Sequence, residues 1–267
     1  MNILVCVKQV PDTSEIRIDP VKNTLIRDGV PSILNTFDAF ALEQALKLKD
    51  ADPENVKVIV VSMGPPQAET MLRDCLAVGA NQAFLVTDRK FGGSDTLATS
   101  YILTNAIKTV EKRVGKIDMI FCGKQAIDGD TAQVGPEIAE QLDIPQVTYG
   151  IKIAKHEDKL HVTRELDDCK LVVETQIPCL VTFTKTDALR FPTIKSKMAA
   201  KKAEIVKITS EDFEDLDESR LGLKGSPTRV RKTFTPSQKV GGVIIKEDDA
   251  DVAVEKLFAE LEAIKLV

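Results

Sequence analysis

Residues 123–142, GKQAIDGDTAQVGPEIAEQL, combine a glycine, a polar stretch and the start of an amphipathic segment. The spacing predicts a helix over residues 131–142, whose first turn presents unpaired N–H groups and the positive end of the helix dipole. Such a helix start is a favourable site for a phosphate, and the side chains of Thr131 and Gln133 add hydrogen-bond donors. One hypothesis for this turn is therefore nucleotide binding.

Three residues of the same turn support a different interpretation. Asp128 and Asp130 repel a phosphate unless they turn away, and Pro136 lacks an N–H and has to lie within the first turn of the helix. Asp130 followed three residues later by Gln133 also fits an ordinary helix cap. A well-capped structural helix thus remains open as the alternative.

A second glycine-rich turn, FGGSDTLATS at residues 91–100, opens another expected helix. Its glycines allow the backbone to approach a ligand closely, whereas Ser94, Asp95 or Thr96 can simply cap the helix. The turn also resembles the S-G-G-x-D-[ST] loop of ATP pyrophosphatases. In that family the loop follows the first strand, and here it follows the third.

Side chains for covalent or metal chemistry are not grouped. The two histidines, His156 and His161, flank an expected hairpin turn, and no Ser/His/Asp or Cys/His grouping or metal-ligand spacing is apparent. The sequence therefore favours binding and positioning over acid–base catalysis, with no metal.

The elements that must position these turns follow from periodicity. Short Val- and Ile-rich runs alternate with segments of helical period, which predicts an α/β fold with a doubly wound, mostly parallel, Rossmann-like sheet over most of residues 1–145. The expected strands are 3–7, 56–62, 82–86 and 118–122, and the expected helices are 37–49, 71–78, 97–110 and 131–142. Ligands of such sheets bind where loops converge beyond the carboxyl ends of the strands. The loops at 7–20 and 62–69 should reach the same edge as the two glycine-rich turns.

The pattern changes after residue 145. Residues 147–155, 159–166 and 170–185 are β-type segments joined by polar turns, which predicts antiparallel additions to the sheet. From residue 189 the chain becomes irregular, and it ends in an amphipathic helix over residues 249–264. We expect a nucleotide-binding domain at 1–200 and a C-terminal arm at 201–267 that packs on another chain. An arm that wraps its own domain is the alternative.

Composition limits the class of protein. With 267 residues, 43% hydrophobic content and a formal net charge of −5, the chain is globular, and no general nucleic-acid partner is expected. The N-terminus lacks the basic region of a signal peptide, and no apolar run is long enough to span a membrane. The five cysteines form no C-x-x-C pair, which favours reduced thiols in the cytoplasm.

Specific motifs resemble one known family. LVCVKQVPD, ALEQALKLKD, VSMGPPQAE, the 123–142 stretch, PQVT and LRFPTIKSKMAAKKAEI occur in the order and at the spacing of the beta subunit of electron-transfer flavoproteins. The resemblance implies a heterodimer with an alpha subunit that carries an FAD. It also implies a nucleotide site in this chain, with AMP in ordinary members and a second FAD in electron-bifurcating members.

The positions of the nucleotide contacts are carried over from the family's motifs. They are Cys6, Asn35, Thr36, Phe37, Asp38, Met63, Gly123, Lys124, Gln125, Ala126, Ile127, Asp128, Gly129, Asp130, Thr131, Ala132, Gln133 and Val134.

Two stretches resemble the bifurcating members more than the AMP-binding type. Residues 91–100 are similar to their nicotinamide-dinucleotide loop, with Gly93, Asp95, Thr96 and Thr99 as candidates, and residues 26–45 are similar to their corresponding segment. FAD with NADH as substrate is therefore expected, with ferredoxin or flavodoxin as low-potential acceptor, and AMP is the alternative. Outside this family, the competing hypotheses are an ATP-using pyrophosphatase-like enzyme and a stress-type nucleotide-binding protein.

The segment LRFPTIKSKMAAKKAEI resembles the family's recognition loop for acyl-CoA-type dehydrogenases. The resemblance places Ile194 as an apolar anchor, and Lys195 and Lys197 as neighbours that steer an acidic partner. An ordinary residue of a packed helix is the alternative for Ile194.

Overall fold

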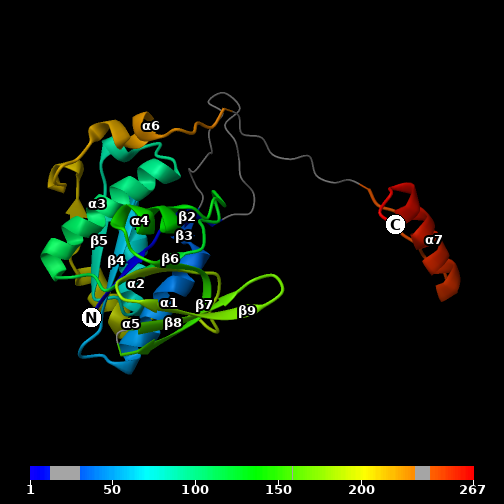
Figure 1. Ribbon diagram of the computed structural model, residues 1–267, viewed down its shortest axis with the longest axis horizontal. Coiled ribbons are helices and arrows are strands. Elements are labelled where there is room, and N and C mark those ends of the chain that lie inside the picture. Colours follow the sequence, from blue (N-terminus) through cyan, green and yellow to red (C-terminus); the bar gives the residue numbers. More distant parts are fainter. Residues whose placement is uncertain (13–30, 158, 232–240) are drawn as a thin grey trace. The chain divides into compact units, whose positions relative to one another are not determined.

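The computed structural model describes residues 1–12, 31–157, 159–231 and 241–267 (Figure 1). Most of the expected loop at 7–20 and the beginning of the segment at 26–45 lie outside these residues. The described residues fall into two units, one ending at Arg231 and one comprising residues 241–267.

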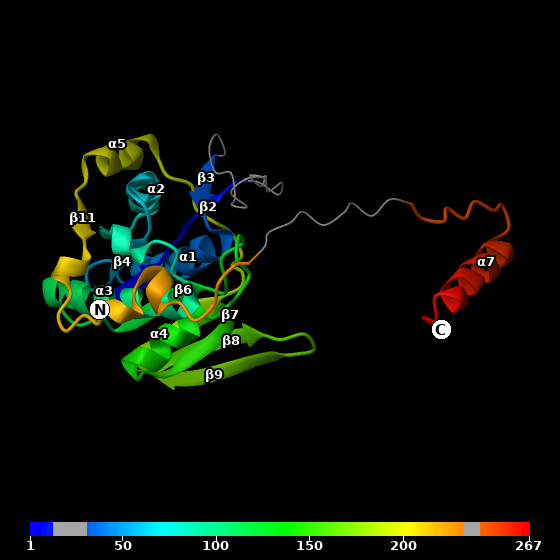
Figure 2. The same ribbon diagram turned by 90° about the horizontal axis from the view of Figure 1, so that it is seen from above.

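A nine-stranded sheet forms the centre of the first unit (Figures 1 and 2). Seven neighbouring strands are parallel, and β8 and β9 extend the sheet antiparallel beside β7. In spatial order the strands are β11 (Ile205–Ile208), β5 (Gln82–Val86), β4 (Lys57–Met63), β1 (Asn2–Cys6), β6 (Met119–Gly123), β10 (Cys179–Phe183), β7 (Gln146–His156), β8 (Lys159–Glu165) and β9 (Lys170–Gln176). A separate two-stranded ribbon joins β2 (Gln9–Pro11) to β3 (Ser32–Leu34).

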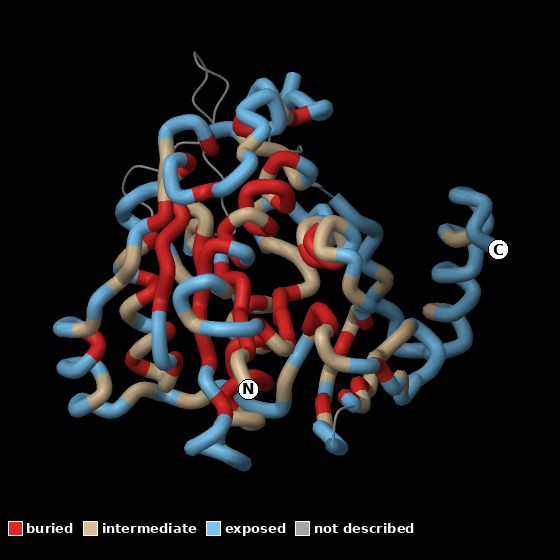
Figure 3. The backbone as a smooth tube through the Cα atoms, turned by 60° about the vertical axis from the view of Figure 1, so that its left-hand side comes forward, coloured by how far each residue is buried: buried red, intermediate tan, exposed pale blue. Residues whose placement is uncertain are grey.

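Helices cover both faces of this sheet. On one face α1 (Thr36–Ala51) and α2 (Glu69–Val78) bury their apolar sides, and on the other α3 (Thr96–Val114) and α4 (Val134–Leu142) do so. Figure 3 shows the buried strands between these layers. The doubly wound α/β prediction is confirmed. The central strands of a sheet covered on both faces must be apolar along their length, as VIVV in β4 and IFC in β6 are.

The strand order reverses beside β1. The chain builds outward from β1 through β4 to β5, and then crosses back to place β6 on the other side of β1. The carboxyl ends of β1 and β6 therefore lie at a topological switch point, where open α/β sheets bind ligands.

The helix expected at residues 131–142 begins later than the sequence predicts. α4 starts at Val134, not at Thr131, and its N-cap is Gln133, whose side chain makes no capping hydrogen bond. The predicted cap Asp130 and also Ala132 have left-handed backbones, with φ values of 52° and 53°, which a continuing helix does not allow. Pro136 lies at the third position of α4, within the first turn as expected.

The second half of the chain contributes more to the parallel sheet than expected. The antiparallel addition is confirmed for β8 and β9, but β10 inserts in parallel between β6 and β7 with all five of its residues buried. Beyond residue 189, where irregular structure was expected, α5 (Ile194–Lys202) packs beside α2, and β11 pairs with β5 at the sheet edge. Short helical turns and α6 (Gly222–Gly225) follow, so the compact unit extends past residue 200 to Arg231.

The second unit contains α7 (Ala250–Ala263), which agrees with the helix expected at 249–264. Asp249 caps this helix by accepting a hydrogen bond from the N–H of Asp251 at 2.9 Å. No residue of α7 is buried, although Val254, Leu257 and Phe258 give it apolar positions.

Candidate functional site

A buried carboxylate joins the ends of the two central strands. Asp38 in the first turn of α1 is 7% exposed, and its two oxygens accept the N–H of Lys8 at 2.8 Å and of Gly123 at 3.1 Å. Burial raises the pKa of the Asp38 carboxyl to about 7, while its hydrogen bonds and the charge of Lys8 act in the opposite direction. Asp38 therefore fixes the residues after β1 and at the end of β6 relative to each other.

Asn35 holds the next part of the loop. It is fully buried, and its amide donates to the carbonyl of Gln125 at 2.8 Å and accepts the N–H of Ile127 at 3.1 Å. These bonds explain why Asn35, at the N-cap position of α1, makes no side-chain cap. The side chains of Asn35 and Asp38 thus position the 123–134 loop, and their expected contact with a nucleotide stays a prediction.

The acidic residues of the loop are paired. Asp128 forms an ion pair with the ammonium of Lys8 at 2.7 Å, and Asp130 accepts a hydrogen bond from Nε2 of Gln125 at 2.6 Å. The ion pair with Lys8 reduces the repulsion that Asp128 would exert on a phosphate, whereas Asp130 bonds only to a neutral amide.

Free donors lie next to these pairs. Among the described residues, no acceptor bonds the backbone N–H groups of Thr131, Ala132 and Gln133, which precede α4. A Cβ added to Gly129 would meet nothing within 4 Å, so the loop is open there. Unpaired N–H groups at the positive end of a helix fit the phosphate of a nucleotide.

Three further predicted contacts lie at or directly after the carboxyl ends of β6, β1 and β4. Lys124 borders an open hollow of about 1070 Å³ together with Tyr149, and its ammonium lies 5.5 Å from the centre of the Tyr149 ring. The side chain of Cys6 is 8% exposed and lies opposite Cys122, where a hydrogen bond with Cys6 and burial raise the pKa of the Cys122 thiol. Met63, half-buried at the end of β4, packs against the same core.

The remaining predicted contacts differ in accessibility. Thr36 is exposed at the start of α1, and Phe37 and Ala126 are half-buried. Ile127 is 40% exposed, and Val134 packs partly into the core beside α3.

The second glycine-rich turn is engaged within the chain. Asp95 caps α3 through the N–H of Ala98 at 3.1 Å, and its other oxygen accepts the hydroxyl of Thr228 at 2.8 Å. A Cβ added to Gly93 would lie 2.6 Å from Leu223. The expected NADH contacts Gly93 and Asp95 therefore face residues 221–228 of the same chain, a partnership that the sequence did not indicate.

The two turns nevertheless lie close together. The hydroxyl of Thr96 donates to Glu137 of α4 at 3.2 Å, while Thr99 is half-buried on α3. The other oxygen of Glu137 is buried and has no hydrogen-bond partner in the described part of the chain, and burial raises the pKa of this carboxyl. An unpaired buried oxygen thus lies between the starts of α3 and α4.

The expected docking segment is exposed. Ile194 begins α5 with 82% of its surface accessible, and Lys195 and Lys197 are exposed beside it. Phe191, at 92%, and Met198, at 61%, add apolar surface that the sequence did not single out. In the sequence, the signal for an exposed Phe191 is an aromatic residue in a polar segment directly before Pro192.

Comparison with known proteins decides the family. The family model described as "Electron transfer flavoprotein domain" matches residues 22–213. The chain belongs to the electron transfer flavoprotein family. It is 53% identical over 272 residues to an electron transfer flavoprotein subunit beta of Megasphaera elsdenii, with 100% of both chains covered.

Two other relatives of this family are named as parts of reductase complexes. The CarD subunit of the caffeyl-CoA reductase–Etf complex of Acetobacterium woodii is 47% identical over 263 residues, with 98% of each chain covered. The electron transfer subunit gamma of an acryloyl-CoA reductase of Anaerotignum propionicum is 46% identical over 267 residues, again with 98% of each covered. The chain thus matches electron-transport flavoprotein subunits along its whole length.

None of the helices in the described residues has the length and apolar character needed to span a membrane. The five cysteines are free; Cys169 is exposed, and the other four are buried.

Proposed function

We propose that this chain is the beta subunit of a heterodimeric electron transfer flavoprotein and that residues 123–134 hold the phosphate of an adenine nucleotide. The observation that carries the site is the combination of free N–H groups at Thr131 to Gln133 with paired carboxylates at Asp128 and Asp130. A phosphate there gains hydrogen bonds and a favourable dipole, and the ammonium of Lys8 offsets the charge of Asp128. Family membership favours this redox role over the pyrophosphatase and stress-protein hypotheses.

We propose further that the nucleotide is FAD and that NADH reduces it. A flavin supplies hydride acceptance and one-electron transfer, and this chain's residues bind and orient it. Two relatives named as partners of CoA-thioester reductases support the bifurcating type, with electrons passing to an acyl-CoA-type dehydrogenase and to ferredoxin or flavodoxin. A cytoplasmic location belongs to the same proposal.

The nucleotide content of the purified heterodimer tests this choice. The chain is produced together with its alpha subunit, denatured, and the released nucleotides are separated and quantified. We expect two FAD and no AMP per heterodimer. One FAD with one AMP would reject the bifurcating type and leave the nucleotide site in place.

The C-terminal unit is proposed to pack on the alpha subunit. Val254, Leu257 and Phe258 give α7 an exposed apolar surface of the kind that packs on a partner chain. Removing residues 241–267 should weaken association with the alpha subunit, measured by sedimentation. An unchanged dissociation constant would refute this assignment.

Ile194, with Lys195 and Lys197, is proposed as the contact for the dehydrogenase. An exposed aliphatic side chain surrounded by lysines suits a transient complex, because the apolar contact gives specificity and the charges accelerate encounter. Ile194→Ala should therefore raise the KM for the dehydrogenase without lowering stability.

A further inference from the structure

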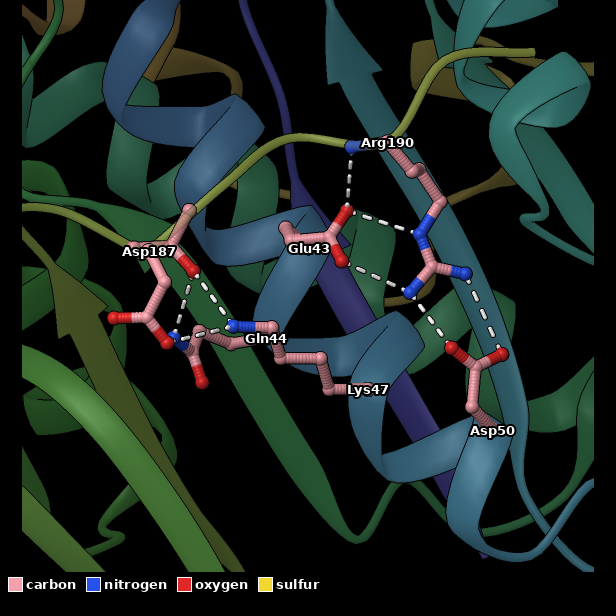
Figure 4. Close-up of polar contacts among 7 residues, drawn as sticks. Glu43, Gln44, Lys47, Asp50, Asp187 and Arg190 are labelled. Atoms are coloured by element: carbon pink, nitrogen blue, oxygen red, sulfur yellow. Dashed lines mark hydrogen bonds and ion pairs between the residues drawn. The ribbon is translucent and has the colours of Figure 1, made fainter.

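The segment that leads into α5 is fixed to α1 by ion pairs (Figure 4). Arg190 donates to Glu43 through Nε at 2.9 Å, through Nη2 at 2.9 Å and through its backbone N–H at 3.2 Å. The same guanidinium pairs with Asp50, with 2.8 Å between Nη2 and Oδ2. Because Glu43 is 6% exposed, its charge depends on Arg190 for compensation.

Further bonds continue along the same side of α1. Gln44 and Lys47 both donate to the hydroxyl of Thr186 at 3.1 Å, and Lys47 also pairs with Asp187 at 3.5 Å. Figure 4 shows these side chains reaching from α1 to the segment that carries Asp187 and Arg190. The segment is therefore held to α1 up to the residue immediately before the exposed Phe191.

Hydrophobic packing does little to hold α5 itself. Ala200 is the one buried residue of this fully described helix. At its C-terminal end, Arg73 of α2 donates to the carbonyls of Ala200 at 2.9 Å, Lys201 at 3.0 Å and Ala203 at 3.1 Å. A cation at this end also complements the helix dipole. The position of Ile194 thus depends on polar attachments at both ends of the segment.

We propose that Arg190 is a positioning residue for dehydrogenase docking: its ion pairs with Glu43 and Asp50 hold the chain so that Phe191 and Ile194 are presented together to the partner. The proposal rests on the docking role proposed for Ile194. A segment already held in its bound position loses less conformational entropy on binding, so the contact gains affinity without added surface. Arg190 itself need not touch the dehydrogenase.

The experiment compares variants of the complete heterodimer with its alpha subunit. Electron exchange is measured with purified butyryl-CoA dehydrogenase as the probe, and cleavage by trypsin after Lys195, Lys197, Lys201 and Lys202 reports how firmly the segment is held. For Arg190→Gln we expect the KM for the dehydrogenase to rise about tenfold with kcat nearly unchanged, because the change affects binding and not the transfer step. Trypsin cleavage of the segment should become faster.

Three further variants separate positioning from general destabilisation. Glu43→Gln combined with Arg190→Gln avoids an unpaired buried charge, and should keep the wild-type urea midpoint while the KM remains high. Arg190→Lys, which lacks the fork needed to bridge Glu43 and Asp50, should give an intermediate KM. Lys112→Ala removes an exposed ion pair with Glu214 that starts from α3, on the other face of the sheet, and should leave the KM unchanged.

The outcomes separate the positioning role of Arg190 from the docking role of Ile194 on which it rests. A raised KM for Ile194→Ala together with a normal KM and normal cleavage for Arg190→Gln would overturn the positioning role and keep the docking role. Normal KM values for both variants would overturn both. Equal losses of kcat, urea midpoint and docking in the double variant would show that Arg190 acts in stability alone.

Discussion

The carboxylate of Asp38 and the backbone of Gly123 lie in direct contact, with 3.1 Å between Oδ1 and the amide nitrogen. A Cβ on Gly123 would come within 2.3 Å of that oxygen and 2.6 Å of the backbone of Phe37. The absence of a side chain at Gly123 lets the end of β6 approach α1 closely. This close approach fixes the position at which the 123–134 loop begins.

Gly123→Ala should destabilise the protein by about 1–3 kcal/mol, because backbone and a buried carboxylate must move to admit the methyl group. The free energy of unfolding in urea is the measurement. Gly129→Ala is the matched control, since its Cβ meets nothing within 4 Å, and should change stability by less than about 0.5 kcal/mol. Equal effects at both glycines would contradict this packing.

Asp38 should make stability depend on pH. Because its pKa is raised to about 7 in the folded protein, the folded state retains a proton that the unfolded state has lost. Its contribution to stability therefore falls as pH rises from about 4, the unfolded pKa, to about 7, by up to ~1.4 kcal/mol per pH unit. Comparing wild type with Asp38→Asn at pH 5 and pH 7 isolates this slope from other groups. The same slope in both proteins would show that Asp38 is ionised throughout.

Thr131→Glu should weaken nucleotide binding at the beta site and leave the flavin of the alpha subunit bound. A carboxylate beside the free N–H groups competes with the phosphate, and we expect about tenfold weaker binding from this charge at the helix start. Thr131→Gln has nearly the same size without the charge and should retain the nucleotide. If Gln and Glu release it equally, bulk and not charge is responsible.

Gly93→Ala should raise the KM for NADH if the 91–100 turn binds the dinucleotide. The substitution can also raise the KM indirectly, because the new Cβ would collide with Leu223 and the backbone φ of Gly93 is 76°. The pair Gly93→Ala and Leu223→Ala relieves that collision. A KM that stays high in the pair indicates direct contact with NADH, whereas a normal KM in the pair would place the effect in residues 221–228.

The central sheet and its helices were predictable because long apolar periods are a local property of the chain. The strand predicted at 82–86 coincides with β5, and the helix predicted at 249–264 differs from α7 by one residue at each end. The start of α4 was not predictable: Asp130 has the residue type of a cap, but its left-handed backbone is set by the turn and its bonds to Ala126 and Gln125.

Long-range pairing explains the other differences. β11 has only four residues and a single neighbour, so nothing in Ile205 to Ile208 identifies β5 as its partner. Likewise, the family motif places Asn35 and Asp38 at the nucleotide site, but only the fold shows that their side chains bond to the loop itself. Arg190 and Glu43 are 147 positions apart, which no local pattern connects.

A crystal structure of the heterodimer with its bound nucleotide measures the central claim most directly. We expect phosphate oxygens within hydrogen-bonding distance of the N–H groups of Thr131, Ala132 and Gln133, with Asp128 still paired to Lys8. A nucleotide phosphate bound elsewhere, with these three N–H groups facing solvent, would contradict it.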